Sequence, residues 1–149
     1  LMSNHFHILI KEIRQNGTTD FMRKLLTSYS SYFNKRHNRV GTLFQSRFKA
    51  QHVHRDEHLK YLFAYIHLNP VKIIKPQWKE KDLQNLTGIK KFLEDYLYSS
   101  YQEYIGPSYG SREESAILYR QVFPDYFAAP HSFKDFVHDW LTYKEIANT

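Results

Sequence analysis

Two histidines separated by one residue, His5 and His7, stand within the first ten residues of the chain. Apolar and polar side chains alternate around them, which predicts a β-strand over residues 4–10 with both imidazoles on one face. Two residues along a strand cover about 6.6 Å, so both rings can reach one divalent ion. The alternative is a solvent-facing strand that carries two histidines without a function, and the pair alone does not decide between them.

Tyr65 and Asn69 form a second pair, four residues apart on a helix predicted over residues 57–69. Residues at this spacing share one helical face, here beside the apolar stripe rather than within it. The tyrosine can present its hydroxyl there, and the amide carbonyl is a hard oxygen ligand. The alternative is a rim residue of the core followed by a helix end, because the residue before Pro70 is disfavoured in the α region.

Together, these residue types suggest one reaction. Two imidazoles and an amide oxygen would hold Mg²⁺ or Mn²⁺ with open positions, and such an ion polarises a phosphodiester. A neighbouring tyrosine would be the nucleophile and would form a covalent phosphotyrosine.

The charge distribution favours an anionic partner for the first half of the chain. The 149 residues carry a net charge of +6, but residues 1–75 hold 13 Lys and Arg against 4 Asp and Glu, which gives +9 there and −3 beyond. Solvated charged faces are the alternative, and the +9 excess favours DNA. Aromatic residues make up 17% of the chain and could stack unpaired bases. The candidate DNA contacts, including one glutamine that could read a base edge, are Arg14, Arg23, Lys24, Lys35, Arg36, Arg39, Gln45, Arg47 and Lys49.

Further elements must position these residues. Apolar spacing predicts a helix over residues 19–37, alternation predicts a second strand over residues 47–54, and Asp56 is expected to cap the helix that carries Tyr65. Its expected apolar stripe consists of Leu59, Leu62, Phe63 and Ile66.

The second half of the chain is expected to be a polar linker over residues 75–92 followed by helices. Ser111 and Ser132 each precede an acidic residue by three positions, as in capping boxes. The apolar stripe over residues 133–141 indicates core or a protein contact.

The composition also excludes several classes of protein. The chain has no cysteine, so disulfides, thiolate metal sites and cysteine nucleophiles are excluded. No apolar run approaches the ~18 residues that span a bilayer, so no membrane partner is expected. A reducing compartment, the bacterial cytoplasm, fits this composition.

Four segments resemble the tyrosine HUH transposases that act on single-stranded DNA, the Y1 transposases. Residues 1–9, LMSNHFHIL, resemble the family stretch LMPNHVHLL, with Ser3 in place of proline. Residues 41–49, GTLFQSRFK, are similar to G-x-L-[FW]-Q-x-R-[FY]-K, and residues 61–71, YLFAYIHLNPV, resemble the nucleophile helix RYIHLNPV. Residues 98–106, YSSYQEYIG, resemble the tail of the subgroup associated with repetitive extragenic palindromes.

This resemblance implies an α/β (α+β) fold, a ferredoxin-like HUH sandwich with an antiparallel central sheet that carries the histidines. It implies that His5 and His7 are the metal pair, Asn69 the third ligand and Tyr65 the nucleophile. Family members cleave and rejoin single-stranded DNA near hairpins, forming a 5′-phosphotyrosine and leaving a 3′-hydroxyl. Single-stranded DNA hairpins are therefore the expected partner, and the chain is expected to act as a monomer or homodimer.

Family members carry a strand and a helix before the LMPNH stretch, and this sequence begins at that stretch. We therefore expect both elements to be missing and the edge of the histidine strand to be exposed. The expected domains are a truncated catalytic domain over residues 1–75, a linker and tail segment over 76–106, and a helical extension over 107–149.

The sequence therefore predicts a metal-dependent transposase or endonuclease that acts on single-stranded hairpins. The alternative is a non-catalytic hairpin-binding module derived from a transposase, and the four intact site residues argue against it. A purely structural oligomer formed through the aromatic tail is disfavoured by the basic first half. The second histidine pair, His52 and His54, is expected at the surface or facing DNA rather than in the metal site.

Overall fold

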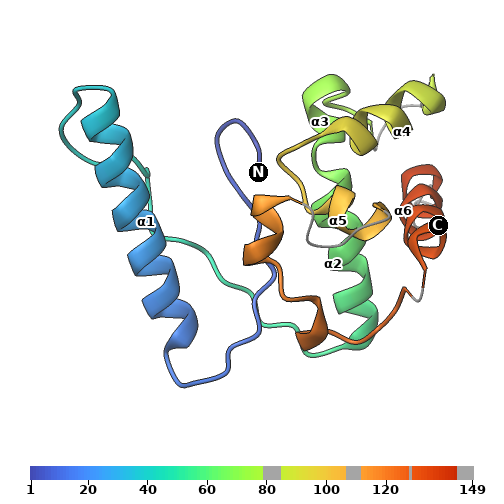
Figure 1. Cartoon of the computed structure of the whole chain (residues 1–149), viewed down its shortest axis with the longest axis horizontal. Helices are drawn as coiled ribbons and strands as arrows, with labels where there is room; N and C mark the ends of the chain where they lie inside the picture. The colour runs from blue at the N-terminus through green and yellow to red at the C-terminus, as the bar shows by residue number, and fades with distance from the viewer. Residues whose placement is uncertain (79–84, 107–111, 128, 144–149) are drawn as a thin grey trace, which may run out of the picture. The chain divides into compact units, whose positions relative to one another are not determined.

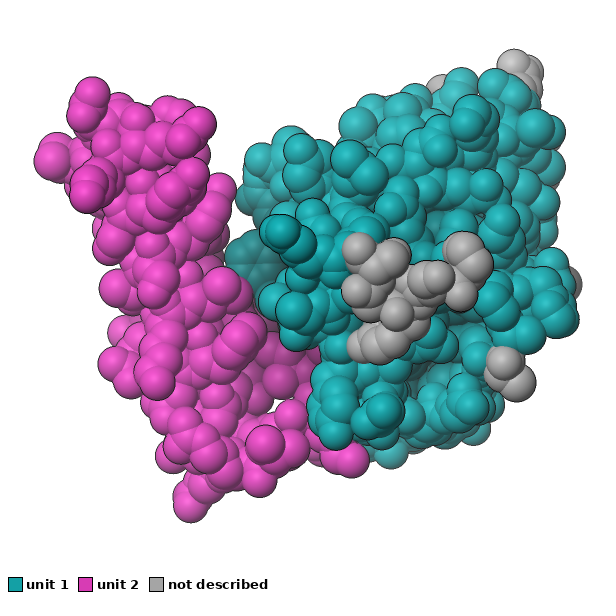
Figure 2. Space-filling model, viewed as in Figure 1, with its two compact units in different colours: residues 1–8, 54–149 teal, residues 9–53 magenta. Residues whose placement is uncertain are grey.

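The structure is a computed structural model that describes residues 1–78, 85–106, 112–127 and 129–143. Two compact units make up the chain, one of residues 1–8 and 54–149 and the other of residues 9–53 (Figure 2). None of the described helices is both long and apolar enough to cross a membrane. The three domains expected from the sequence stay a prediction.

The predicted α/β sandwich with a central antiparallel sheet is wrong, because the described residues contain no β-strand (Figure 1). Residues 4–10 and 47–54, the two predicted strands, have neither helical nor strand pairing. A strand needs a neighbour that completes its backbone hydrogen bonds, and neither segment pairs with another described segment. The apolar face of the first segment is not buried either, since Ile8 and Ile10 keep 46% and 37% of their surface exposed.

In the unit of residues 9–53, helix α1 (Gly17–Arg36) confirms the helix predicted over residues 19–37. It begins after Asn16, whose φ of 60° lies in the left-handed region that asparagine tolerates. The backbone N–H of Thr18 donates to the Glu12 carboxylate at 3.0 Å, which satisfies one of the open donors of the first turn.

In the other unit, helix α2 (Asp56–Leu68) confirms the predicted helix that carries Tyr65. The expected cap is wrong by one residue: Arg55 is the N-cap, and Asp56 is the first helical residue. There its carboxylate pairs with Lys60 at 2.8 Å and accepts a hydrogen bond from the Tyr126 hydroxyl. A carboxylate in the first turn also stabilises the positive end of the helix dipole.

Helix α2 ends at Leu68, before Pro70 as expected, but Asn69 does not leave the α region, and that part of the expectation is wrong. Asn69 has φ −55° and ψ −37°, Pro70 has φ −57° and ψ −23°, and α3 (Val71–Ile74) follows directly. The backbone N–H of Lys72 donates to the Asn69 carbonyl at 3.1 Å. Because proline fits the first turn of a helix, the chain keeps a helical path through it.

Of the remaining helices, α6 contacts α2, α5 contacts α6, and α4 contacts α3 and α5. Part of the predicted linker is helical, since α4 begins within it and buries Ile89 and Leu93, which are spaced one turn apart. Ser111 lies outside the described residues, and Ser132 lies in the first turn of α6 rather than before it. The elements are α4 (Leu86–Asp95), α5 (Tyr101–Ile105), η1 (Glu113–Ile117), η2 (Arg120–Val122) and α6 (Pro130–Thr142).

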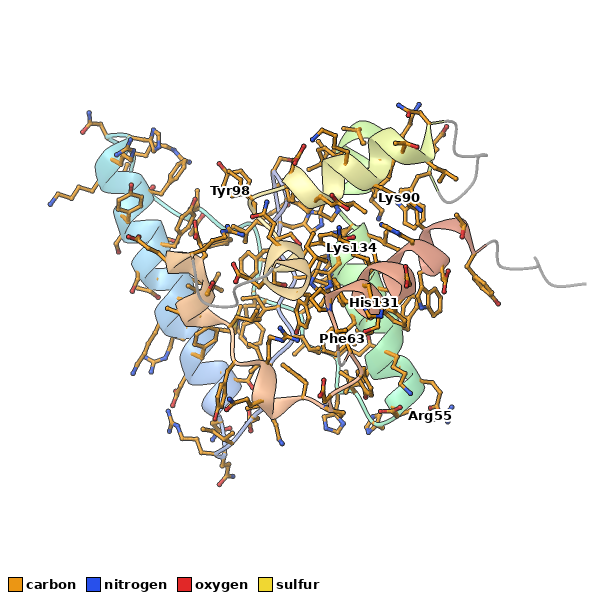
Figure 3. All side chains as sticks on the ribbon, turned by 45° about the vertical axis from the view of Figure 1, so that its right-hand side comes forward. Arg55, Phe63, Lys90, Tyr98, His131 and Lys134 are labelled. Atoms are coloured by element: carbon orange, nitrogen blue, oxygen red, sulfur yellow. The ribbon has the colours of Figure 1, made fainter. Side chains whose placement is uncertain are left out.

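The core of this unit is an aromatic cluster between α2, α5 and α6 (Figure 3). Phe63 meets four rings edge-on at centroid distances of 5.7–6.0 Å, those of Tyr104, Phe123, Tyr126 and Phe127. Phe133, 0% exposed, stacks on Tyr104 at 4.5 Å. The stripe predicted over residues 133–141 is therefore core, with Phe133, Val137 and Leu141 buried.

The buried face of α2 differs from the predicted stripe. Phe63 is buried as expected, but Leu59, Leu62 and Ile66 are only half-buried. The buried residues of this helix are Phe63, Ala64, His67 and Leu68. The small Ala64 side chain permits close approach of neighbouring elements. His67 is a polar residue type, so a pattern built on apolar residues does not place it in the core face.

His67 is 3% exposed, and both ring nitrogens have partners. Nδ1 lies 2.6 Å from the Phe63 carbonyl and Nε2 lies 2.8 Å from the Ser100 hydroxyl. A carbonyl only accepts, so Nδ1 carries the proton and the serine hydroxyl donates to Nε2. Burial lowers the pKa of His67 to about 4, because the charged form loses its hydration.

We expect this histidine to make the free energy of unfolding depend on pH. The unfolded chain binds a proton at His67 near pH 6.5, whereas the folded chain binds it only near pH 4, so stability falls as the pH drops between these values. The loss is about 1.4 kcal/mol per pH unit, or about 3 kcal/mol in total. Urea unfolding of the wild type and His67→Gln at pH 7 and pH 4.5 measures it; an equal loss in both proteins would contradict the assignment.

Candidate functional site

Four predicted site residues come together within one unit. His5 and His7 lie on the irregular segment that precedes residue 9, while Tyr65 lies on α2 and Asn69 at its C-terminal end. The imidazoles of His5 and His7 are 5.1 Å apart with their planes at 82°, and the His7 and Tyr65 rings are 5.3 Å apart at 71°. The Asn69 Nδ2 lies 3.4 Å from the His5 Nε2. The structure thus joins two segments that are more than fifty residues apart in the sequence.

The ring of His5 is oriented by its neighbour. Its Nδ1 lies 2.7 Å from the Asn4 Oδ1, and a carbonyl oxygen can only accept, so Nδ1 carries the proton. The lone pair is then on Nε2, the nitrogen that faces Asn69. Here Nε2 accepts from the Asn69 Nδ2 at 3.4 Å. A ring nitrogen that donates to an oxygen, as Nδ1 does, is also found in metal-binding histidines, where it orients the other nitrogen.

Asn69 contributes a polar atom that has no partner. Its side chain is 3% exposed, and its Oδ1 is buried without a hydrogen bond. A buried carbonyl oxygen left unsatisfied costs about 1–3 kcal/mol, so this position is unfavourable unless a ligand completes it. The oxygen belongs to the same side chain whose nitrogen faces His5.

The surroundings of His7 favour its neutral form. Partial desolvation is the main cause that lowers the pKa of His7, and nearby positive charge such as that of Lys72 acts in the same direction. A neutral imidazole offers a lone pair. No three His, Cys, Asp or Glu side chains cluster in the described part of the chain, at this site included. A third protein ligand beside His5 and His7 would therefore be of another residue type, and the Asn69 amide is the candidate.

Tyr65 is positioned from both sides of α2. Its ring lies 6.0 Å from that of Tyr61, which in turn meets Trp140 of α6 edge-on at 5.3 Å. Phe63 and His67 lie on the opposite, buried side of the helix. Because that side is packed, the helix cannot rotate, and Tyr65 stays beside His7.

All nine predicted DNA contacts fall within the unit of residues 9–53, and every one is exposed. This stretch holds nine Lys and Arg against two Asp and Glu, a net charge of +7, whereas the remaining residues sum to −1. Arg14 and Arg23 pair with Asp20, and the guanidinium of Arg39 lies 5.7 Å from the Phe33 ring centroid.

Exposed aromatic side chains accompany these charges on α1. Phe21, Tyr29 and Tyr32 keep 47%, 49% and 58% of their surface exposed, and only Met22 of this helix is buried. The unit therefore presents cations and rings together, the combination that single-stranded nucleic acids bind.

One residue near the site, Lys72, was not predicted from the sequence to be functional. Lys72 lies beyond Pro70, where the helix was expected to have ended, so its spacing from Tyr65 carried no structural meaning. The signal that could have found it is the seven-residue separation from Tyr65, which matters only if the helical path continues.

The first 69 of the 149 residues, which include the four candidate site residues, match a known family. Residues 1–69 match the family of IS200-like transposases. The matched range contains His5, His7, Tyr65 and Asn69, and it supports a transposase-related function for this chain. No curated protein and no solved structure matches the chain.

Proposed function

We propose that this chain is a metal-dependent transposase that cleaves and rejoins single-stranded DNA at hairpins through a 5′-phosphotyrosine on Tyr65. The observation that carries the proposal is the Tyr65 ring against His7, with His5 and Asn69 beside it, inside the segment that matches the IS200-like transposases. The likeness of residues 98–106 to the subgroup associated with repetitive extragenic palindromes belongs to the same proposal.

The donor set at the site fits Mg²⁺ or Mn²⁺. His5 and His7 would supply imidazole nitrogens, and Asn69 would supply the Oδ1 that has no hydrogen bond. A divalent ion bound there supplies polarisation of the phosphodiester. The protein's own part is to hold both rings and the amide on one side of Tyr65.

Tyr65 performs the bond exchange. Its hydroxyl oxygen attacks the phosphorus, the bond from phosphorus to the 3′ oxygen breaks, and the departing oxygen takes a proton to leave a 3′-hydroxyl. The phenol loses one proton and the leaving oxygen gains one, so the reaction is balanced and needs no energy source. Attack by the 3′-hydroxyl on the phosphotyrosine reverses the step and rejoins the strand.

The unit of residues 9–53 would bind the DNA. Its net charge of +7 attracts phosphates, and the exposed rings of α1 offer faces on which unpaired bases can stack. Gln45 is exposed in the same unit, where its amide could read a base edge. Binding and chemistry then depend on different residues and can be tested separately.

Tyr65→Phe should abolish the covalent adduct and leave DNA affinity nearly unchanged, because only the attacking hydroxyl is removed. A hairpin DNA labelled at its 3′ end, incubated with the chain and Mn²⁺, should yield labelled protein on a denaturing gel. The same DNA labelled at its 5′ end should instead release a free fragment. Tyr61→Phe, which removes the neighbouring hydroxyl of the same helix, is the matched control and should keep the adduct.

An adduct that persists in Tyr65→Phe would reject the nucleophile assignment. A shifted hairpin on a native gel, without any adduct in the wild type, would favour the non-catalytic binding module instead.

Removing both rings, His5→Ala with His7→Ala, should abolish Mn²⁺ binding measured by calorimetry, since two of three ligands are lost. The second histidine pair provides the control: His52→Ala with His54→Ala should bind Mn²⁺ as the wild type does. Equal Mn²⁺ binding by both double variants would reject His5 and His7 as the metal ligands.

Hairpin affinity should fall steeply with salt, because each neutralised phosphate releases counterions. Lys35→Gln with Arg36→Gln should reduce the slope of log Kd against log salt by about 1.4, or about 0.7 for each lost contact on single-stranded DNA. Lys90→Gln with Lys91→Gln, an adjacent pair on α4 of the other unit, should leave the slope unchanged. Titrations followed by fluorescence anisotropy measure both; a reversed ranking would remove residues 9–53 from the DNA surface.

A further inference from the structure

The backbone keeps a helical path beyond the end of α2, the helix on which Tyr65 lies. Asn69 and Pro70 both keep right-handed helical backbone angles, and α3 continues from Val71. The backbone bonds follow the same path: Asn69 N–H donates to the Tyr65 carbonyl at 2.9 Å, and Lys72 N–H donates to the Asn69 carbonyl at 3.1 Å. The chain therefore makes a nearly continuous helical path from Tyr65 to Lys72.

The spacing on this path places a cation beside the site. Tyr65, Asn69 and Lys72 stand at positions i, i+4 and i+7, which share one side of a helix. Seven residues rise about 10 Å, and helical side chains tilt toward the N-terminus, so Lys72 tilts toward Asn69 and Tyr65. The flexible stem of a lysine covers much of the remaining separation.

The charge of Lys72 is not neutralised by a neighbour. It is exposed, and among the described residues no carboxylate pairs with it. Other lysines of this unit do have such partners: Lys60 pairs with Asp56 at 2.8 Å, and Lys134 with Glu94 at 2.9 Å. The ammonium of Lys72 also lies within electrostatic reach of His7. Lys72 thus supplies, within reach of His7, a positive charge that no carboxylate of the described residues pairs with.

We propose that Lys72 is a catalytic residue that contacts a non-bridging oxygen of the phosphodiester attacked by Tyr65. This inference rests on the proposed function and adds a phosphate-binding cation to it. The negative charge on the non-bridging oxygens is redistributed in the transition state, while the bond from the Tyr65 oxygen to phosphorus forms and the bond to the 3′ oxygen breaks. An ammonium at that oxygen stabilises the charge, and it neither gains nor loses a proton in the step.

The test measures the single-turnover rate of adduct formation at saturating hairpin DNA, with hairpin Kd measured beside it. Lys72→Gln should slow adduct formation about 100-fold, which is the usual loss when one preorganised donor is removed from a charged transition state. Its Kd should change less than about threefold, since one of many phosphate contacts is lost. Lys72→Arg retains the charge and should keep the rate within about tenfold of the wild type.

Lys75→Gln is the matched control, because it removes one positive charge three residues further on, at the end of α3. It should form adduct at the wild-type rate. A wild-type rate in Lys72→Gln, an equal loss in Lys72→Arg, or a loss found only in Kd would each overturn the catalytic role of Lys72 while leaving the Tyr65 reaction standing. No adduct in the wild type would overturn the proposed function itself, and this inference with it.

Discussion

The packing of one face of α2 determines how Tyr65 and Asn69 are presented. Phe63 is enclosed by four aromatic rings, and one turn later His67 is buried with both nitrogens bonded. Rotating or sliding the helix would leave this histidine unsatisfied and open the aromatic cluster, so the helix has one acceptable position. Tyr65 and Asn69 lie on the other side and inherit that position. Much of this packing comes from α5, α6 and the residues between them, which the matched segment does not include.

The two units divide the electrostatic work. Residues 9–53 carry all of the net positive charge, while the unit that holds Tyr65 is nearly neutral, at −1. A strong positive potential near the site residues would raise the affinity for any anion, including the DNA products. Positive charge in another segment instead attracts the whole DNA strand at long range. Near Tyr65, Lys72 is an exposed cation with no carboxylate partner among the described residues, whereas Lys60 and Lys134 are paired with carboxylates.

The positions of the first two helices could be predicted from the sequence, whereas the fold class could not. Periodic apolar spacing located α1 and α2 within two residues. The structure brings His5, His7, Tyr65 and Asn69 close together, and their roles as metal ligands and nucleophile stay a prediction. The sheet failed because alternation reports only an extended face, and strand formation depends on a partner elsewhere in the chain. The prediction that Asn69 leaves the α region failed because the local preference of a residue before proline was overridden. Proline fits well in the first turn of a helix, so the helical backbone continues through it.

The segment that carries His5 and His7 belongs to no helix or sheet among the described residues, and the His5 Nε2 approaches the Asn69 amide at 3.4 Å. The start of this segment is held by the Leu1 amine, which donates to the Tyr98 carbonyl at 2.6 Å, and by the Met2 N–H, which donates to the His5 carbonyl at 2.8 Å. Ordering the rest of the segment around a ligand costs conformational entropy, about 1–2 kcal/mol for each residue ordered. Under the proposed function, whichever of ion and DNA binds first would bear this cost, and the second would bind to a segment already ordered. The irregular backbone before α1 would then couple the two ligands even without a direct contact.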